Sequence, residues 1–189
     1  MKPLLAFEGV TLRRGGRLLF EGLDLTLGPG EALHVSGPNG SGKTSLIRLA
    51  AGLLRAEKGR VERSTLALAD EAAALDRELP LGRALAFWAR LQGSPERLQT
   101  AIYAMGLAGL ADVPVRLLSS GQSKRATLAR VAASSAQLWL LDEPLNGLDS
   151  DSIERLGALI DSHRSAGGAV LAASHSPLAG DWARLELAR

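Results

Sequence analysis

One stretch decides how this sequence folds: Gly37-Pro38-Asn39-Gly40-Ser41-Gly42-Lys43-Thr44. It fits the pattern G-x-x-x-x-G-K-[ST], in which small residues allow the backbone N–H groups to turn inward around a polyphosphate. The helix that begins there adds the partial positive charge of its N-terminus. Lys43 is expected to neutralise the β- and γ-phosphates, and the Thr44 hydroxyl is expected to bind Mg²⁺. The stretch therefore predicts a nucleotide-binding loop.

The residues around this loop supply the context that it needs. An apolar strand is expected at 32–35, directly before the loop, and an amphipathic helix is expected directly after it, ending shortly before Gly59. The alternative is a glycine-rich turn that binds nothing. A strand before the loop and a helix after it favour the phosphate-binding interpretation over that alternative.

Farther from the loop, apolar strands alternate with helices. Strands are expected at 4–12, 23–27, 138–141 and 169–173, and helices at 81–92, 95–108, 120–136 and 150–165. Ser94 is the expected N-cap of the helix that begins at Pro95, and residues 60–78 carry no clear pattern. This alternation predicts an α/β fold with a mostly parallel sheet, and the early strands, linked by glycine turns, predict an antiparallel β flank.

Composition excludes several classes of protein. A length of 189 residues with 46% apolar residues predicts a single domain, 1–189, with a sizeable core. The net charge, 22 − 20 = +2, argues against nucleic-acid binding. The absence of cysteine excludes disulfides, thiolate zinc sites and Fe–S clusters. Because no apolar run is long enough to cross a bilayer, the chain is expected to be soluble and to stay on the side where it is made.

A pair of acids follows a fully apolar strand in Leu138-Trp139-Leu140-Leu141-Asp142-Glu143. Parallel α/β sheets bind their ligands at the carboxyl ends of their strands, and this pair is expected to lie at that edge. Asp142 is expected to hold Mg²⁺ through water, and Glu143 to orient or deprotonate an attacking water. The alternative is an ordinary turn at the end of a strand, which would be favoured if the phosphate-binding loop were absent.

A second candidate anion site is Leu118-Ser119-Ser120-Gly121-Gln122, before a long helix. Ser120 and Gly121 would place a hydroxyl and free N–H groups at the N-terminus of that helix. Most such sequences are simple N-caps. Here, one loop already surrounds the phosphates, so the second site is expected to act across a subunit interface, on a nucleotide that the partner chain holds.

These motifs, with Asn146-Gly147-Leu148-Asp149 and His175, occur in one order along the chain. The whole chain resembles the nucleotide-binding domain of ABC-type ATPases. The resemblance implies a P-loop NTPase fold with a small helical subdomain at about 72–135, ATP and Mg²⁺ as ligands, and a head-to-tail homodimer. The residues that it places on the partner's nucleotide are Ser119, Ser120, Gly121 and Gln122. It also implies that Asp149 belongs to a turn that bridges the two sites, and that His175 hydrogen-bonds the γ-phosphate.

His175 has a plainer alternative as a residue of a surface loop. The other two histidines have no expected role: His34 is predicted to lie in a strand, and His163 on a solvated helix face. Phe87 and Trp88 are adjacent, and one of them is expected to pack in the core while the other receives a membrane subunit.

The sequence departs from the usual family pattern at three places. Ser120 stands where many members have glycine, and residues 12–17 lack the aromatic side chain that stacks on adenine, so that Arg13 or Arg14 is left to do so. The glutamine expected near 69–73 is replaced by Ala72, with Glu71 beside it. Glu71 could serve partly in its place, although its charge would oppose the phosphates unless the metal ion compensates.

Within the family, the chain is similar to the ATP-binding subunits of haem exporters that act in cytochrome c maturation. This similarity implies an ATP-hydrolysing, peripheral subunit at the cytoplasmic face of the inner membrane. Its expected partner is an integral-membrane permease subunit (CcmB-like), with CcmC- and CcmE-like components nearby. Direct binding of haem is not expected, because the chain has no cysteine. The alternatives are the ATPase of another small ABC exporter, a non-ABC small-molecule kinase, a soluble ABC protein, and a nucleotide-gated scaffold with little turnover.

Overall fold

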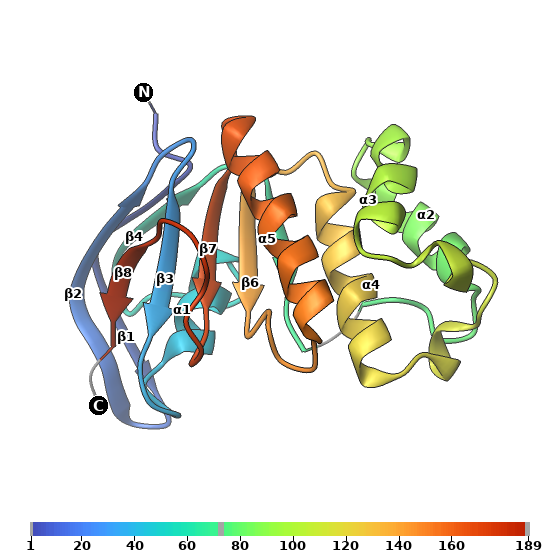
Figure 1. The fold of residues 1–189 in the computed structure, drawn as a ribbon. Helices are drawn as coiled ribbons and strands as arrows, with labels where there is room; N and C mark the ends of the chain where they lie inside the picture. Colours follow the sequence, from blue (N-terminus) through green and yellow to red (C-terminus); the bar gives the residue numbers. More distant parts are fainter. Residues whose placement is uncertain (1, 72–73, 188–189) are drawn as a thin grey trace.

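The computed structural model describes residues 2–71 and 74–187 and contains two sheets (Figure 1). The first is antiparallel, with the strand order β2-β1-β4, and the second is parallel, with the order β5-β6-β7-β3-β8. The strands are β1 Leu5–Arg14, β2 Arg17–Leu27, β3 Ala32–Ser36, β4 Lys58–Arg63, β5 Leu66–Ala69, β6 Leu138–Asp142, β7 Ala169–Ala173 and β8 Ala183–Glu186. The α-helices are α1 Lys43–Ala50, α2 Leu81–Leu91, α3 Leu98–Ala104, α4 Ser120–Ala132 and α5 Ser150–Ser165.

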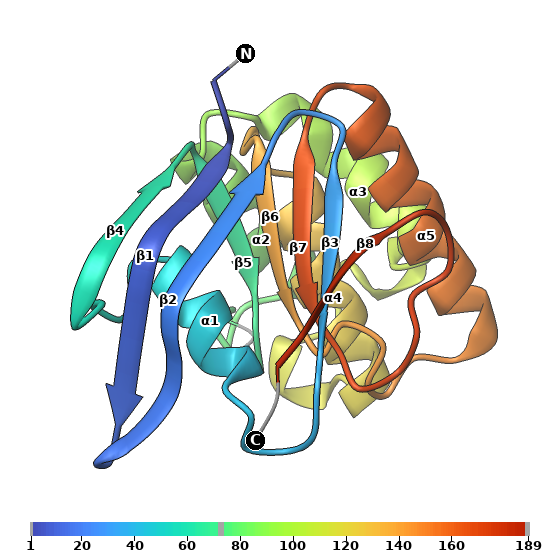
Figure 2. The same cartoon turned by 90° about the vertical axis from the view of Figure 1, so that its left-hand side faces the viewer.

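The central strands β6 and β7 of the parallel sheet are apolar except for Asp142 at the end of β6, because both faces of the sheet are covered. All five residues of β6 and all five of β7 are buried. Successive β6 side chains point to opposite faces. Leu138 and Leu140 pack with α1 and the antiparallel sheet, whereas Trp139 and Leu141 pack with the other helices. Figure 2 shows α1 between the two sheets.

The antiparallel flank is confirmed, and it ends in an exposed edge. Leu23 and Leu25 of β2 are half-buried while Asp24 and Thr26 are exposed, which is the alternation expected of a strand with one solvated face. The strand is longer than predicted, because it begins at Arg17, directly after the turn. This flank lies against the side of the molecule that carries α1 (Figure 2).

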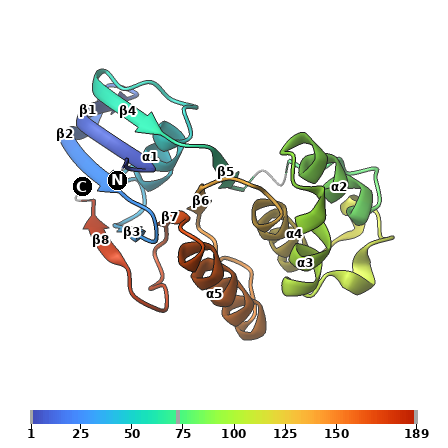
Figure 3. The same ribbon diagram turned by 90° about the horizontal axis from the view of Figure 1, so that it is seen from above.

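Helices α2, α3 and α4 follow one another between β5 and β6, and lie together at one end of the molecule, away from β1, β2 and β4 (Figure 3). They share a core with α5 and with one face of the parallel sheet. Short 3-10 helices connect them, namely η1 Pro95–Arg97, η2 Ala108–Leu110 and η3 Val115–Leu117. Within residues 2–71 and 74–187, none of the helices combines the length and the hydropathy that a membrane span requires.

The structure corrects several predicted boundaries. Residues 60–78, which showed no pattern, contribute most of β4 and all of β5, and β8 was missed altogether. These three strands lie at sheet edges, where only one neighbour pairs with them and the apolar pattern is weak.

The helical end of the molecule required further corrections. The predicted helix at 95–108 is divided into η1, α3 and η2, and α4 ends at Ala132 instead of 136. Ser94 caps no helix through its side chain. It is fully buried, and its Oγ donates to the Ala133 carbonyl oxygen at 2.7 Å, so a tertiary bond replaces the local one.

Candidate functional site

The glycine-rich loop connects the carboxyl end of β3 to the start of α1. Gly37, Gly40 and Gly42 have φ values of 143°, 81° and 107°, which side chains with a Cβ rarely adopt. A Cβ on Gly37 would also lie 2.5 Å from the Leu187 carbonyl oxygen. Gly42 caps α1 without a side-chain hydrogen bond. The first N–H groups of α1 are therefore available to an anion.

Lys43 turns back over the loop that precedes it. Its Nζ donates to the carbonyl oxygens of Gly37 at 2.8 Å and Pro38 at 3.4 Å. The Ser41 Oγ is buried in the same loop and has no hydrogen-bond partner among the described residues. A buried lysine and an unpartnered hydroxyl, close in sequence to the free N–H groups at the start of α1, fit a polyphosphate.

Thr44 and Asp142 meet across the gap between α1 and β6. The Thr44 Oγ1 donates to Asp142 Oδ1 at 3.3 Å. Burial raises the pKa of Asp142, and the Thr44 hydrogen bond opposes that shift. These oxygens suit Mg²⁺, which usually binds one or two protein oxygens and completes its shell with water and phosphate oxygens. The described residues contain no group of three or more His, Cys, Asp or Glu that could hold a metal ion.

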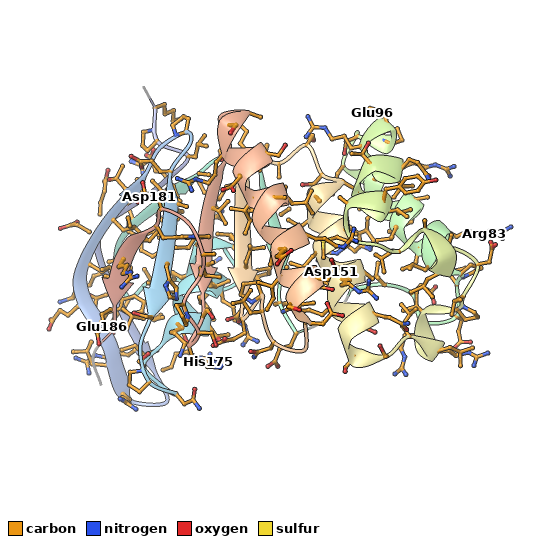
Figure 4. All side chains as sticks on the ribbon, in the orientation of Figure 1. Arg83, Glu96, Asp151, His175, Asp181 and Glu186 are labelled. Carbon is orange, nitrogen blue, oxygen red and sulfur yellow. The ribbon has the colours of Figure 1, made fainter. Side chains whose placement is uncertain are left out.

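Glu143 and His175 form a pair beside this site. Oε2 of Glu143 accepts hydrogen bonds from His175 Nδ1 at 2.8 Å and from the His175 backbone N–H at 3.3 Å. Glu143 has the left-handed φ of 45°, and its N–H donates to the Ala173 carbonyl oxygen at 2.8 Å. Figure 4 shows His175 at the edge of the molecule where the parallel strands end. The strained backbone therefore directs the Glu143 carboxylate toward His175.

Most of these groups, but not Ser41 or Asp142, line one cleft of about 780 Å³, a size that accommodates a small organic ligand. The residues of the cleft that come from the predicted set are Gly37, Pro38, Asn39, Gly40, Gly42, Lys43, Thr44, Glu143 and His175. Leu19 and Asn146 also line this cleft. Asn146 belongs to one of the motifs quoted above, whereas nothing in the sequence around Leu19 pointed to a role in the site. Arg14 lines the cleft, whereas Arg13 pairs with Glu57 at 3.3 Å.

The residues Ser119 to Gln122 do not line this cleft. They form a reciprocal cap of α4, in which Ser119 Oγ accepts from the Gln122 N–H at 3.2 Å and Gln122 Oε1 accepts from the Ser119 N–H at 2.9 Å. Ser119, and not Ser120, is therefore the N-cap. Ser120 is exposed and lines a separate cavity of about 310 Å³, whose wall also contains Glu143 and Asn146.

Lys124 connects α4 to the end of β6, a contact that the sequence did not reveal. Its Nζ donates to the Asp142 carbonyl oxygen at 3.1 Å. Burial lowers the pKa of Lys124, and the carboxylates of Asp142, Glu143, Asp70 and Glu71 oppose that shift. The helix that carries Ser120 is thereby fixed to the strand that carries Asp142.

The turn at Gly147 to Asp149 packs on the start of α4. Asp149 is the N-cap of α5, and its Oδ1 accepts from the Ser152 N–H at 2.8 Å. Hydrogen bonds from Ser152 lower the pKa of Asp149. Gly121 fits closely against this turn, since a Cβ there would lie 2.8 Å from the Gly147 carbonyl oxygen. The contact of Asp149 with nucleotide stays a prediction.

The prediction that His163 lies on a solvated helix face was wrong. Its ring stacks on Trp139 with centroids 3.9 Å apart, and its Nε2 lies 3.2 Å from the Gln137 carbonyl oxygen. Burial lowers its pKa. His34 lies in β3, as predicted. The predicted replacement of glutamine by Ala72 lies outside the described residues.

The fold and the cleft define a P-loop nucleoside triphosphatase. The family model for ABC transporters matches residues 20–146. Two similar curated proteins are both named cytochrome c biogenesis ATP-binding export protein CcmA. The one from Sphingopyxis alaskensis is 58% identical over 95% of this chain and 93% of its own. The one from Novosphingobium aromaticivorans is 56% identical over 93% and 90%.

The chain therefore belongs to the ABC transporter family, as an ATP-binding ATPase related to these biogenesis proteins. A solved ATP-binding subunit of an ABC transporter has the same fold, with a TM-score of 0.84 over 91% of this chain and 79% of that chain at 22% identity.

Proposed function

We propose that this chain is the ATP-hydrolysing subunit of a membrane transporter that acts in cytochrome c maturation, in haem export or release of the haem chaperone. The names of the similar curated proteins support the pathway. The cleft that joins the loop at 37–44 to Asp142, Glu143 and His175 supports the reaction. In this proposal, residues 1–189 form one ATP-binding domain, with a helical subdomain at about 72–135.

The side chains of the cleft have separate tasks. Lys43 and the N–H groups of the loop hold the β- and γ-phosphates, while Thr44 and Asp142 hold Mg²⁺, which when bound neutralises phosphate charge. Glu143 orients the attacking water and accepts its proton. His175 holds the Glu143 carboxylate through the 2.8 Å bond from Nδ1, and reaches toward the γ-phosphate.

Two copies complete the two sites. The observation that carries this step is that Ser120 is exposed and lines a cavity other than the cleft lined by the phosphate loop at 37–44 of the same chain. Ser119, Ser120, Gly121 and Gln122 contact the nucleotide of the partner copy, which leads to a head-to-tail homodimer. Charge-assisted bonds to the γ-phosphate hold the dimer closed, and hydrolysis removes them.

The opening and closing of the dimer act on a membrane partner. We expect an integral-membrane permease subunit of the CcmB type, with CcmC- and CcmE-like components nearby, so that the chain is peripheral at the cytoplasmic face of the inner membrane. Phe87 is 58% exposed on α2, whereas Trp88 beside it is half-buried, so Phe87 is the aromatic residue that docks. Haem binds the partners and not this chain, and nucleic acid is no partner.

The test is the oligomeric state of Glu143→Gln with MgATP, measured by light scattering after size exclusion. The variant should bind ATP, fail to hydrolyse it and elute as a dimer, whereas Lys43→Ala should bind no ATP and stay monomeric. A Glu143→Gln protein that hydrolyses ATP at the wild-type rate would show that Glu143 is not the general base. A variant that stays monomeric at saturating MgATP, with and without the permease, would contradict the dimer.

A further inference from the structure

His34 is a buried histidine on the strand that leads into the phosphate loop, and the proposed mechanism gives it no role. It lies in β3, which pairs in parallel with β7 beside it, so that His34 is level with Ala172 (Figure 1). Its exposed fraction is 7%, and it is not among the residues that line the nucleotide cleft. A buried polar side chain costs stability unless it is hydrogen-bonded, so the partner of His34 indicates what the residue does.

The partner of His34 is the carbonyl oxygen of Ser174, the first residue after β7. Nε2 of His34 lies 3.0 Å from that oxygen. Because a carbonyl oxygen can only accept a hydrogen bond, Nε2 carries a hydrogen and donates it. Ser174 is itself 1% exposed. The bond is therefore shielded from water, where a hydrogen bond is electrostatically stronger than at the surface.

The peptide group that accepts from His34 also contacts the proposed general base. The N–H of this peptide group belongs to His175, and it donates to Glu143 Oε2 at 3.3 Å. A trans peptide group is planar, and its C=O and N–H point in opposite directions. By holding the carbonyl oxygen on one side, His34 therefore directs the N–H toward Glu143 on the other. The two hydrogen bonds also polarise each other through the peptide group.

Glu143 depends strongly on the segment at 173–175. Its φ of 45° is left-handed, a conformation that persists where neighbouring contacts hold it. Its N–H donates to the Ala173 carbonyl oxygen, and its Oε2 accepts from both the N–H and the Nδ1 of His175. A displacement of this segment would move the carboxylate that must face the attacking water, and small misplacements of a reacting group are costly in rate.

We propose that His34 is a positioning residue for ATP hydrolysis, which holds the peptide group between Ser174 and His175 so that its N–H points at the Glu143 carboxylate. This inference rests on the proposed roles of Glu143 and His175. Because His34 lies outside the wall of the nucleotide cleft, it acts on the chemical step and not on ATP binding. Its loss should therefore lower kcat and leave KM for ATP almost unchanged.

The variant His34→Leu removes the donor and keeps an apolar side chain. We expect its kcat to fall about tenfold, the scale of one hydrogen bond to a charged group, while KM changes by less than about twofold. His34→Gln should restore most of the rate, because its amide nitrogen is as many bonds from Cβ as Nε2 of histidine and can donate to the same oxygen. His34→Asn, whose amide nitrogen is closer to Cβ, should not restore it, and takes the place of His34→Leu if that variant does not fold.

Ser94→Ala is the matched control for lost stability. Ser94 is also buried, and its Oγ donates to the Ala133 carbonyl oxygen at 2.7 Å, but neither residue lines the nucleotide cleft. This variant therefore loses a bond of the same kind and should keep the wild-type kcat. Rates are measured by phosphate release from the full-length chain, per mole of protein that binds ATP, at a temperature where melts show each variant to be folded.

The amide proton of His175 gives a second readout, by NMR, which requires no turnover. Its signal should move upfield in His34→Leu, because the hydrogen bond to Glu143 weakens. It should return toward the wild-type position in His34→Gln, and stay there in Ser94→Ala. A change in stability alone does not produce this order of shifts.

An unchanged kcat or an unmoved His175 amide signal in His34→Leu would overturn this inference, and so would equal losses of rate in His34→Leu and His34→Gln. Glu143→Gln is measured beside these variants. If it hydrolyses ATP at the wild-type rate, the proposed base is refuted, and this inference with it. If Glu143→Gln is inactive while His34→Leu hydrolyses ATP normally, only the role of His34 is refuted.

Discussion

The substitution Gly121→Ala sets two effects on stability against each other: the higher helix propensity of alanine and the steric cost of a new Cβ beside Gly147. Gly121 lies in the first turn of α4, and alanine is favoured over glycine in helices by up to about 1 kcal/mol. The new Cβ would, however, lie 2.8 Å from the Gly147 carbonyl oxygen. Ordinary contact begins at 3.4 Å, so one side must move by 3.4 − 2.8 = 0.6 Å. Overpacking of this kind costs about 1–3 kcal/mol, which exceeds the helical gain.

Gly157→Ala is the matched control, because Gly157 lies inside α5 and a Cβ there would meet nothing within 4 Å. It should raise the Tm by about 2–4 °C, the shift that about 1 kcal/mol produces in a domain of this size. Gly121→Ala should melt about 2–12 °C below Gly157→Ala, since about 1–3 kcal/mol separates the two.

Both melts are measured by circular dichroism, and ATP hydrolysis by phosphate release. Gly121→Ala should also hydrolyse ATP more slowly than Gly157→Ala, because displacement of Gly147 moves the turn that ends at Asp149. Equal melting temperatures would show that the turn yields without cost, and the reasoning from the 2.8 Å contact would then be wrong.

Three further predictions each concern one residue: the close packing of Gly59, the burial of His163 and the exposure of Phe87. Gly59→Ala should lower stability by at least about 2 kcal/mol in denaturant unfolding, because Gly59 has a φ of 83° and its Cβ would lie 2.4 Å from the Glu8 carbonyl oxygen; a smaller loss would contradict this close packing. Burial lowers the pKa of His163 from its ordinary value of 6.5, so its contribution is complete above that pH and is lost below it; the Tm advantage of wild type over His163→Gln should therefore shrink from pH 8 to pH 5, and a constant gap would refute this. Phe87→Ser should change the Tm by less than about 2 °C and abolish stimulation of ATP hydrolysis by the membrane partner, whereas retained stimulation would place docking elsewhere.

Much of the site could be predicted from the sequence because its chemistry depends on residues that are close together along the chain. The loop at 37–44 needs its glycines at fixed positions, and their positive φ values show why. Asp142 and Glu143 follow an apolar strand, and both lie at the predicted edge of the sheet. Thr44 and Asp142 lie 98 positions apart, and the loop pattern and the strand pattern predicted that both would serve Mg²⁺; their direct hydrogen bond was not predicted.

Other contacts had no local signal. In the sequence, nothing distinguishes Lys124 from the other cationic residues of its helix. Only the packing of α4 against β6 shows that its ammonium donates to the Asp142 carbonyl oxygen. His163 fits a solvated helix face by its spacing, but its ring stacks on Trp139 of the sheet. Three of the edge strands, β4, β5 and β8, were missed because a strand with one neighbour and one open side needs few apolar residues.

By itself, the sequence determined the central strands and the main helices, the phosphate loop and the two acids beside it. These depend on hydrophobic periodicity, glycine dihedral angles and the polar ends of buried strands, all of which are local properties. Tertiary structure alone decided that Arg14 and not Arg13 lines the cleft, that Ser120 lines a different cavity, and that Trp88 and Arg130 donate to the carbonyl oxygens of Ala74 and Leu68. Each of these depends on how separate elements pack, because a side chain can be assigned to a cavity only after the neighbouring walls are in place.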